Sequence, residues 1–147
     1  MKKIAYTLLL LSACLLAQNS FAQCAAFTVL KAESKQWVSG APGGNYGTEY
    51  LIAIKLKTAQ PVQIKTLIID HKEVAFEVSN GNNLPVTKTA VGDTLNIQAN
   101  VDKRSEESLP ASKLSYKGKA LLIYKCGGKL CRKTIKELKA MPKLLGM

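Results

Sequence analysis

The sequence predicts an all-β fold, a single antiparallel β-sandwich of about seven strands, on three observations. The chain has 147 residues, 47% of them hydrophobic and 21% charged, which suits one compact domain and argues against wholesale disorder. Apolar and polar residues alternate with a period of two in several segments, as they do in half-buried strands. Short turn-forming segments rich in glycine, proline and asparagine separate these strands, which is typical of a sandwich.

The first four strands are expected in the first 80 residues. An early strand is predicted over Phe27–Val38. The segment 49–57 follows, with apolar residues at every second position from Tyr50 to Leu56. Val62–Ile69 is a third alternating run, and 73–78 is a fourth. The glycine-rich loop 39–48 and the Gln60-Pro61 and Asn80-Gly81 pairs supply the turns between and after them.

The remaining strands are expected after residue 92. The segment 93–101 alternates between apolar and polar residues, and Ala120–Cys126 is apolar on both sides, which predicts a strand buried on both faces. The end of the chain is ambiguous between strand and helix. A strand is expected from Lys133 through about Glu137, followed by a loose tail, because Pro142 would end a helix.

The run Ala90–Ile97 resembles the turn-and-strand entry of immunoglobulin-like modules. The resemblance implies an immunoglobulin-like sandwich, although the Cys, Trp, Cys framework of antibody domains is absent, since Trp37 precedes the core strands. As a whole the chain is similar to small exported immunoglobulin-like β-sandwich proteins of Bacteroidota. That resemblance brings no activity and no site residues.

Residues 1–22 have the features of a secretory signal peptide. Lys2 and Lys3 precede a 14-residue apolar run, and Ser20-Phe21-Ala22 offers a cleavage site, which would leave 23–147 as the mature β-sandwich domain. An alternative is a lipobox, with lipidation at Cys14 anchoring the protein to a membrane. We therefore expect an exported protein, periplasmic or secreted, with no transmembrane segment in the mature chain.

The cysteines predict one disulfide. If Cys126 faces Cys131 across a hairpin, then Leu122 faces Ile135, an apolar pair that favours this register over a tight turn at Gly127-Gly128. We therefore predict a Cys126–Cys131 disulfide, with thiol-redox chemistry as a less favoured alternative. Cys24 is left over, either free, mispaired, or joined to another chain.

The net charge of the mature chain lies entirely in its last 35 residues. The segment 113–147 has ten basic residues and one acid, a net +9, whereas 23–112 has nine of each. This predicts a face suited to polyanionic surfaces, such as lipid phosphate or acidic polysaccharide, or alternatively a lysine-protected edge strand. The candidate residues are Lys125, Lys129, Arg132, Lys133, Lys136 and Lys139.

Other candidate sites are weaker. Trp37, Tyr46 and Tyr50 flank the glycine-rich loop and could form a ligand-binding loop. The chain has a single histidine, His71, which excludes multi-histidine metal sites, and we expect no metal and no cofactor. Specific nucleic-acid recognition is disfavoured because lysine predominates over arginine and no aromatic residues are interleaved.

These patterns favour a non-catalytic binding or accessory module of the cell envelope, with envelope polyanions or another envelope protein as its partner. The alternative is a structural or assembly subunit, joined through Cys24 or through an open sheet edge. An enzyme, either a thiol oxidoreductase or a hydrolase, is the least favoured class because the sequence has a single histidine and lacks the motifs of such enzymes.

Overall fold

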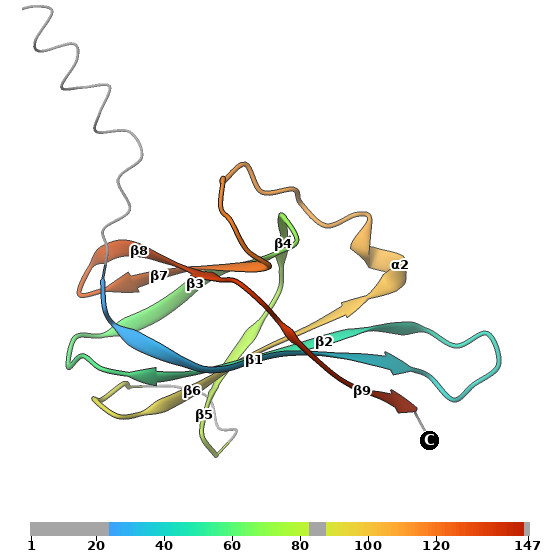
Figure 1. Ribbon diagram of the computed structural model, residues 1–147, viewed down its shortest axis with the longest axis horizontal. Coiled ribbons are helices and arrows are strands. Elements are labelled where there is room, and N and C mark those ends of the chain that lie inside the picture. Colours follow the sequence, from blue (N-terminus) through green and yellow to red (C-terminus); the bar gives the residue numbers. More distant parts are fainter. Residues whose placement is uncertain (1–23, 83–87, 146–147) are drawn as a thin grey trace, which may run out of the picture.

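The computed structural model describes residues 24–82 and 88–145 and shows an all-β sandwich (Figure 1). The predicted signal peptide 1–22, and Cys14 within it, lie outside the described residues. Nine strands are present in the described ranges, two more than predicted. They are β1 (Phe27–Val38), β2 (Tyr46–Leu56), β3 (Val62–Ile69), β4 (Lys72–Val74), β5 (Glu77–Asn80), β6 (Thr94–Asp102), β7 (Ala120–Cys126), β8 (Lys129–Ile135) and β9 (Lys139–Leu145).

The strands form two sheets with an immunoglobulin-like order. One sheet has the order β5-β6-β2-β1-β9 and the other β4-β3-β7-β8. The positions of the strands within the sheets match those of the immunoglobulin fold. In the first sheet, β1, β2, β6 and β5 correspond to strands A, B, E and D, and in the second sheet β3, β7 and β8 correspond to C, F and G. β4 extends the second sheet beside β3, and β9 is an additional strand at the edge of the first.

Two predicted segments differ from the structure. The segment 73–78 is two strands, because the chain leaves one sheet after Val74 and enters the other at Glu77. The end of the chain is the strand β9, which pairs in parallel with β1, and not a loose tail. Pro142 is tolerated there because β9 is an edge strand and the register shifts between Met141 and Leu144.

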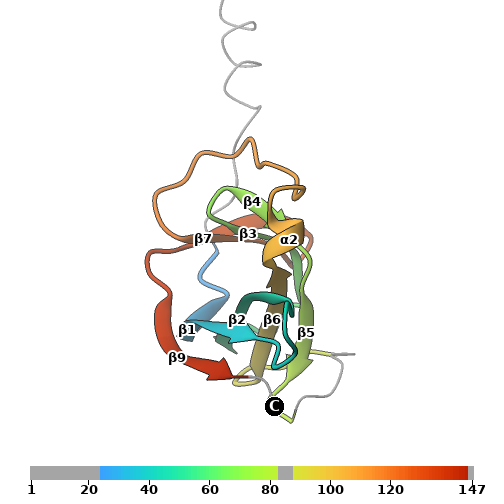
Figure 2. The same ribbon diagram turned by 90° about the vertical axis from the view of Figure 1, so that its right-hand side faces the viewer.

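The core lies between the sheets, where the alternating residues of β2, β3, β6 and β7 meet. Ile52, Ile54, Ile97 and Leu122 are fully buried there. A smaller cluster on the outer surface of β3 and β7 contains Ile68, Leu121 and Ile123 with Tyr116. Figure 2 shows the long connection between β6 and β7 passing over β3 and β7, and its Leu114 and Tyr116 pack in this cluster, which explains why β7 is apolar on both faces. This connection begins with the short helix α2 (Lys103–Glu106).

Candidate polyanion-binding face

The hairpin of β7 and β8 carries most of the predicted basic residues, and its register is set by a two-residue turn. Gly127 and Gly128 have φ angles of 57° and 84°, the left-handed values that a tight hairpin turn requires. Cys126 therefore pairs with Lys129, and Leu122 pairs with Lys133. The predicted register, with Leu122 opposite Ile135, is wrong.

The predicted Cys126–Cys131 disulfide is wrong for the same reason. In the structure Cys131 is bonded to Cys24, with 6.2 Å between their Cα atoms, and Cys126 is a buried free thiol. Cys131 lies opposite Tyr124, whose hydroxyl donates a hydrogen bond of 2.8 Å to the carbonyl oxygen of Cys24. The N-terminal segment is thus held against the hairpin at two points. A disulfide of this kind is typical of proteins that fold in an oxidising compartment.

The basic residues form a strip that wraps around the β8 edge of the second sheet. Lys125 and Arg132 are on its outer surface, where the Arg132 guanidinium donates to the carbonyl oxygen of Ser115 at 3.2 Å. Lys129 and Lys133 have the same side-chain parity as the buried Cys131 and Ile135, yet both are exposed. Because β8 is the edge strand of its sheet in the described structure, these two long side chains can pass the sheet edge into solvent.

The strip continues onto the connection between β8 and β9 and the start of β9. We call its members the basic strip, namely Lys125, Lys129, Arg132, Lys133, Lys136 and Lys139, all of them exposed. In the described part of the chain, no ion pair involves Lys133, Lys136 or Lys139. These three lysines are therefore a concentration of positive charge that forms no ion pair with the described carboxylates.

The same geometry fits the alternative interpretation of the lysines. β8 is an edge strand, and inward-facing charged side chains on such a strand discourage pairing with another chain. This explanation applies to Lys129 and Lys133, which lie on β8. It also fits Lys139, the first residue of the edge strand β9, but it does not account for Lys136, which lies in the connection between the two strands.

The aromatic residues around the glycine-rich loop do not converge on one site. Trp37 pairs with Gly47 on the outer surface of the first sheet, where its ring nitrogen donates to Asn100 Oδ1 at 2.8 Å. A Cβ at position 47 would overlap the Trp37 ring, so the glycine makes room for it. Tyr46 and Tyr50 lie on the opposite face of the sheet, since their positions alternate with that of Gly47.

Tyr50 lines a separate cleft at the open end of the sandwich, with a volume of about 530 Å³. Burial raises the pKa of Tyr50, and the nearby carboxylate of Asp70 raises it further. Asp70 in turn forms an exposed ion pair with Lys119 at 3.9 Å. The neighbouring His71 occupies the β3–β4 turn, and its ring packs on Tyr116 with 4.6 Å between centroids.

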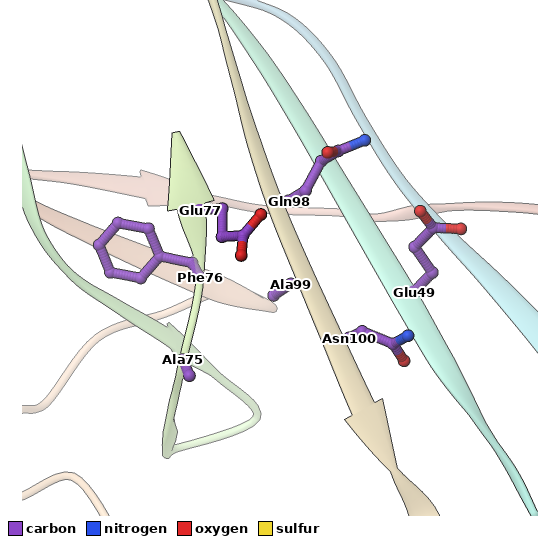
Figure 3. A pocket seen from close by; sticks show the side chains of 7 residues that line it. All are labelled: Glu49, Ala75, Phe76, Glu77, Gln98, Ala99 and Asn100. Carbon is purple, nitrogen blue, oxygen red and sulfur yellow. The ribbon is translucent and has the colours of Figure 1, made fainter. Parts of the chain in front are cut away.

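A shallow hollow of about 420 Å³ lies on the outer surface of the first sheet (Figure 3). Figure 3 shows Glu77 and Glu49 on opposite sides of β6, with Gln98 and Asn100 between them. The two carboxylates come from β5 and β2 and do not point toward one another. This is not the paired arrangement that acid–base hydrolysis uses.

The structure also contains a groove that sequence reasoning missed. It runs between β1 and β8 with a volume of about 570 Å³, and is lined by residues of β1, β8 and the connection to β9. Val29 and Ala32 of β1 meet Ile135 and Leu138 there, although about 100 residues separate them in the chain. Only the sheet order places these residues together, so a local pattern could not have revealed the groove.

Comparisons of the chain with protein-family models, with curated proteins and with solved structures found no match. Over residues 24–82 and 88–145, no three histidine, cysteine, aspartate or glutamate side chains are clustered as metal ligands would be. In the same ranges no helix is long and apolar enough to cross a membrane.

Proposed function

We propose that the chain is an exported, non-catalytic binding module of the cell envelope that holds polyanionic surfaces against its basic strip. The observation that carries the proposal is that Lys133, Lys136 and Lys139 are exposed, close together along the chain and without ion-pair partners in the described residues. The charge distribution supports it, since 113–147 carries a net +9 whereas 23–112 is neutral. An uneven charge of this size attracts anionic surfaces.

The chemistry of the strip favours clustered phosphate or carboxylate groups over a single shaped anion. Nine of the ten basic residues in 113–147 are lysine. A lysine ammonium is a point charge on a flexible stem, whereas bidentate recognition of one phosphate is typical of arginine. Membrane phosphate and acidic polysaccharide present many such charges in a row, whereas recognition of single-stranded nucleic acid typically uses aromatic residues for base stacking, and none is a member of the basic strip.

The test is charge reversal at the three lysines. The variant Lys133→Glu/Lys136→Glu/Lys139→Glu changes the net charge by six units. A matched control, Lys55→Glu/Lys57→Glu/Lys65→Glu, makes the same change at three exposed lysines of the neutral part of the chain. Co-sedimentation of the mature protein with vesicles of phosphatidylglycerol and phosphatidylcholine gives the affinity, and circular dichroism checks the fold.

We expect the strip variant to lose at least tenfold in affinity for anionic vesicles, because each lysine near such a surface contributes about 1 kcal/mol. The control variant should lose less than threefold. Equal losses in both variants would mean that net charge alone drives the association, and an unchanged strip variant would reduce the lysines to ordinary surface. Either result would overturn the proposal.

The second candidate function, an assembly subunit, has one observation in its favour. Over residues 24–82 and 88–145, β8 pairs only with β7 and the first half of β1 pairs only with β2, so both offer open edges to another strand. Assembly through an intermolecular disulfide at Cys24 is not supported, because that sulfur is bonded to Cys131 of the same chain. Light scattering tests the edge route, since an assembly subunit would give oligomers that Leu130→Pro in β8 disrupts.

A further inference from the structure

The groove between β1 and β8 is the place where the two sheets part. β9 pairs with β1 from Glu33 onward, so among the described residues the segment of β1 before Glu33 has no strand partner on this side. Figure 2 shows the connection from β8 to β9 running down this side of the molecule, from one sheet to the other, beside β1. The groove of about 570 Å³ lies along this open side, and its size is that of an ordinary small-ligand site.

The floor of the groove is apolar and continuous with the core. Ile135 is buried, with 5% of its surface exposed, and belongs to the main core cluster. Val29, Ala32 and Leu138 are partly buried and pack against that cluster. These four side chains line the groove, so a strip of the core is open to solvent there. Covering it with an apolar group would be favourable, in proportion to the area removed from water.

The rim of the groove is positively charged. Lys31, Lys133, Lys136 and Lys139 line it, against one acid, Glu137. Lys31 is partly neutralised by an ion pair with Glu33 at 3.8 Å, and in the described residues the other three lysines form none. Three of the six members of the basic strip therefore stand directly over an apolar channel.

A ligand that satisfies both features has an apolar chain and an anionic head. A polysaccharide or a nucleic acid would meet the lysines but would leave the floor uncovered. An uncharged apolar ligand would cover the floor but would leave the lysines without counter-charges. Lysine stems can also lie along an acyl chain while their ammonium groups reach a phosphate.

We propose that the groove between β1 and β8 binds an acyl chain of an anionic lipid, whose phosphate lies on Lys133, Lys136 and Lys139. This proposal rests on the proposed function, because it uses the same lysines and narrows the polyanion to a phosphate-bearing lipid. It adds a site for the chain, which surface electrostatics alone does not require. The protein would then hold single lipid molecules as well as associate with anionic surfaces.

The experiment compares soluble probes that share a head group and differ in chain length. Decyl phosphate and butyl phosphate are titrated into the mature, disulfide-bonded protein by calorimetry below their aggregation concentrations. Decylphosphocholine serves as the probe with the longer chain and no net charge. We expect decyl phosphate to bind at least tenfold more tightly than either of the other two probes. Equal binding of the two phosphates would overturn the groove proposal.

Two substitutions test whether the acyl chain of the ligand lies in the groove. Ala32→Trp fills the groove, and Leu30→Trp is its matched control on the same strand, at an exposed side chain that does not line the groove. We expect Ala32→Trp to reduce the preference for decyl over butyl phosphate to less than twofold and Leu30→Trp to preserve it. If Ala32→Trp fails to fold, Leu138→Asp introduces a repelling charge on the groove floor and should have the same effect. If a folded groove variant still prefers decyl phosphate over butyl phosphate, the acyl chain lies elsewhere and the proposal is overturned.

The vesicle assay separates this proposal from the one on which it rests. Ala32→Trp should leave binding to anionic vesicles within threefold of the unsubstituted protein, because the basic strip is intact. Normal vesicle binding with no chain-length preference would refute the groove and retain the proposed function. If charge reversal at the three lysines leaves vesicle binding unchanged while decyl phosphate is still preferred over butyl phosphate, the proposed function is refuted and an apolar site remains.

Discussion

Tyr124 joins the N-terminal segment, the core and the hairpin through one side chain. Its ring packs on Phe27 with 4.8 Å between centroids, and its hydroxyl donates to the carbonyl of Cys24 at 2.8 Å. Its strand partner is Cys131, which is itself bonded to Cys24. One ring and one disulfide therefore fix where the chain enters the sandwich, and both involve the hairpin that carries four of the six members of the basic strip.

The phenol of Tyr124 makes the stability depend on pH in the alkaline range. Burial raises the pKa of Tyr124 above its usual value near 10, and the neighbouring Cys126 raises it further. The unfolded phenol therefore releases its proton first, so the stabilisation is complete below about pH 10 and is lost as the pH rises through the folded pKa. Tyr124→Phe should cost about 0.5–1.5 kcal/mol at pH 7 through the lost hydrogen bond.

The difference in unfolding free energy between the two proteins should then shrink above pH 10. Urea unfolding at pH 7, 9, 10 and 11 measures it, with Tyr46→Phe as the control at an exposed side chain. A difference that stays constant to pH 11 would contradict the role assigned to burial of the phenol.

The three cysteines of the described chain differ in accessibility and in their contribution to stability. The Cys24–Cys131 disulfide closes a loop with a sequence separation of 107 residues, and its removal by Cys131→Ala should cost about 2–5 kcal/mol. Cys126→Ala should cost only about 1 kcal/mol, because a buried thiol acts as a small apolar group. Chemical denaturation of both variants measures the two costs.

Peptide mapping decides the pairing directly, because Lys129 separates the two hairpin cysteines. Trypsin places Cys126 in the peptide 126–129 and Cys131 in the peptide 130–132. We expect 130–132 to be joined to the peptide that contains Cys24, and 126–129 to accept an alkylating label only after unfolding. A bond between the two hairpin peptides would restore the register that the structure rejects.

Several strands were predictable from the local pattern of apolar residues. The period-two alternation located β6 within one residue, and β3 and β7 were predicted with their bounds, β7 from a run that is apolar on both faces. The hairpin register was not predictable from apolar pairing. Leu122 lies opposite Lys133, and this pair is acceptable only because β8 is a sheet edge from which Lys133 reaches solvent. Edge position is a property of the whole sheet order, so it is absent from the local pattern.

The turn of the hairpin offers a test of what sets that register. Gly128 has φ of 84° and open space around its Cα, so only the backbone conformation restricts the residue there. Gly128→Val should cost about 1–2 kcal/mol because a β-branched residue disfavours positive φ, and Gly128→Asn less than half of that. Thermal unfolding measures both. Equal effects of the two substitutions would mean that the left-handed conformation does not determine the turn.

At the scale of the whole molecule, the fold brings together features that are far apart in the chain. The sandwich and its mostly antiparallel arrangement were predicted from composition and alternation, and the concentration of charge in 113–147 was visible from counting. The groove was not predictable, since β1 contributes half of its floor and the end of β8 with its connection to β9 the other half. The parallel pairing of β9 with β1 leaves this side open only before Glu33, and that boundary depends on where the chain crosses between sheets.

The two proposed modes of binding should respond differently to salt. Binding of an anionic surface by the basic strip is electrostatic, and ions at 0.5 M reduce the screening length to less than half its value at 0.05 M. Burial of an acyl chain removes apolar area from water and is not weakened by screening. Affinity for anionic vesicles should therefore fall at least tenfold between 0.05 and 0.5 M sodium chloride, whereas the preference for decyl over butyl phosphate should change less than twofold. Repeating both titrations at the two salt concentrations measures this. If the preference for decyl over butyl phosphate falls in parallel with vesicle binding, the acyl chain and the phosphate are not held by separate parts of the groove. Val29, Ala32 and Leu138 are then only the exposed margin of the core.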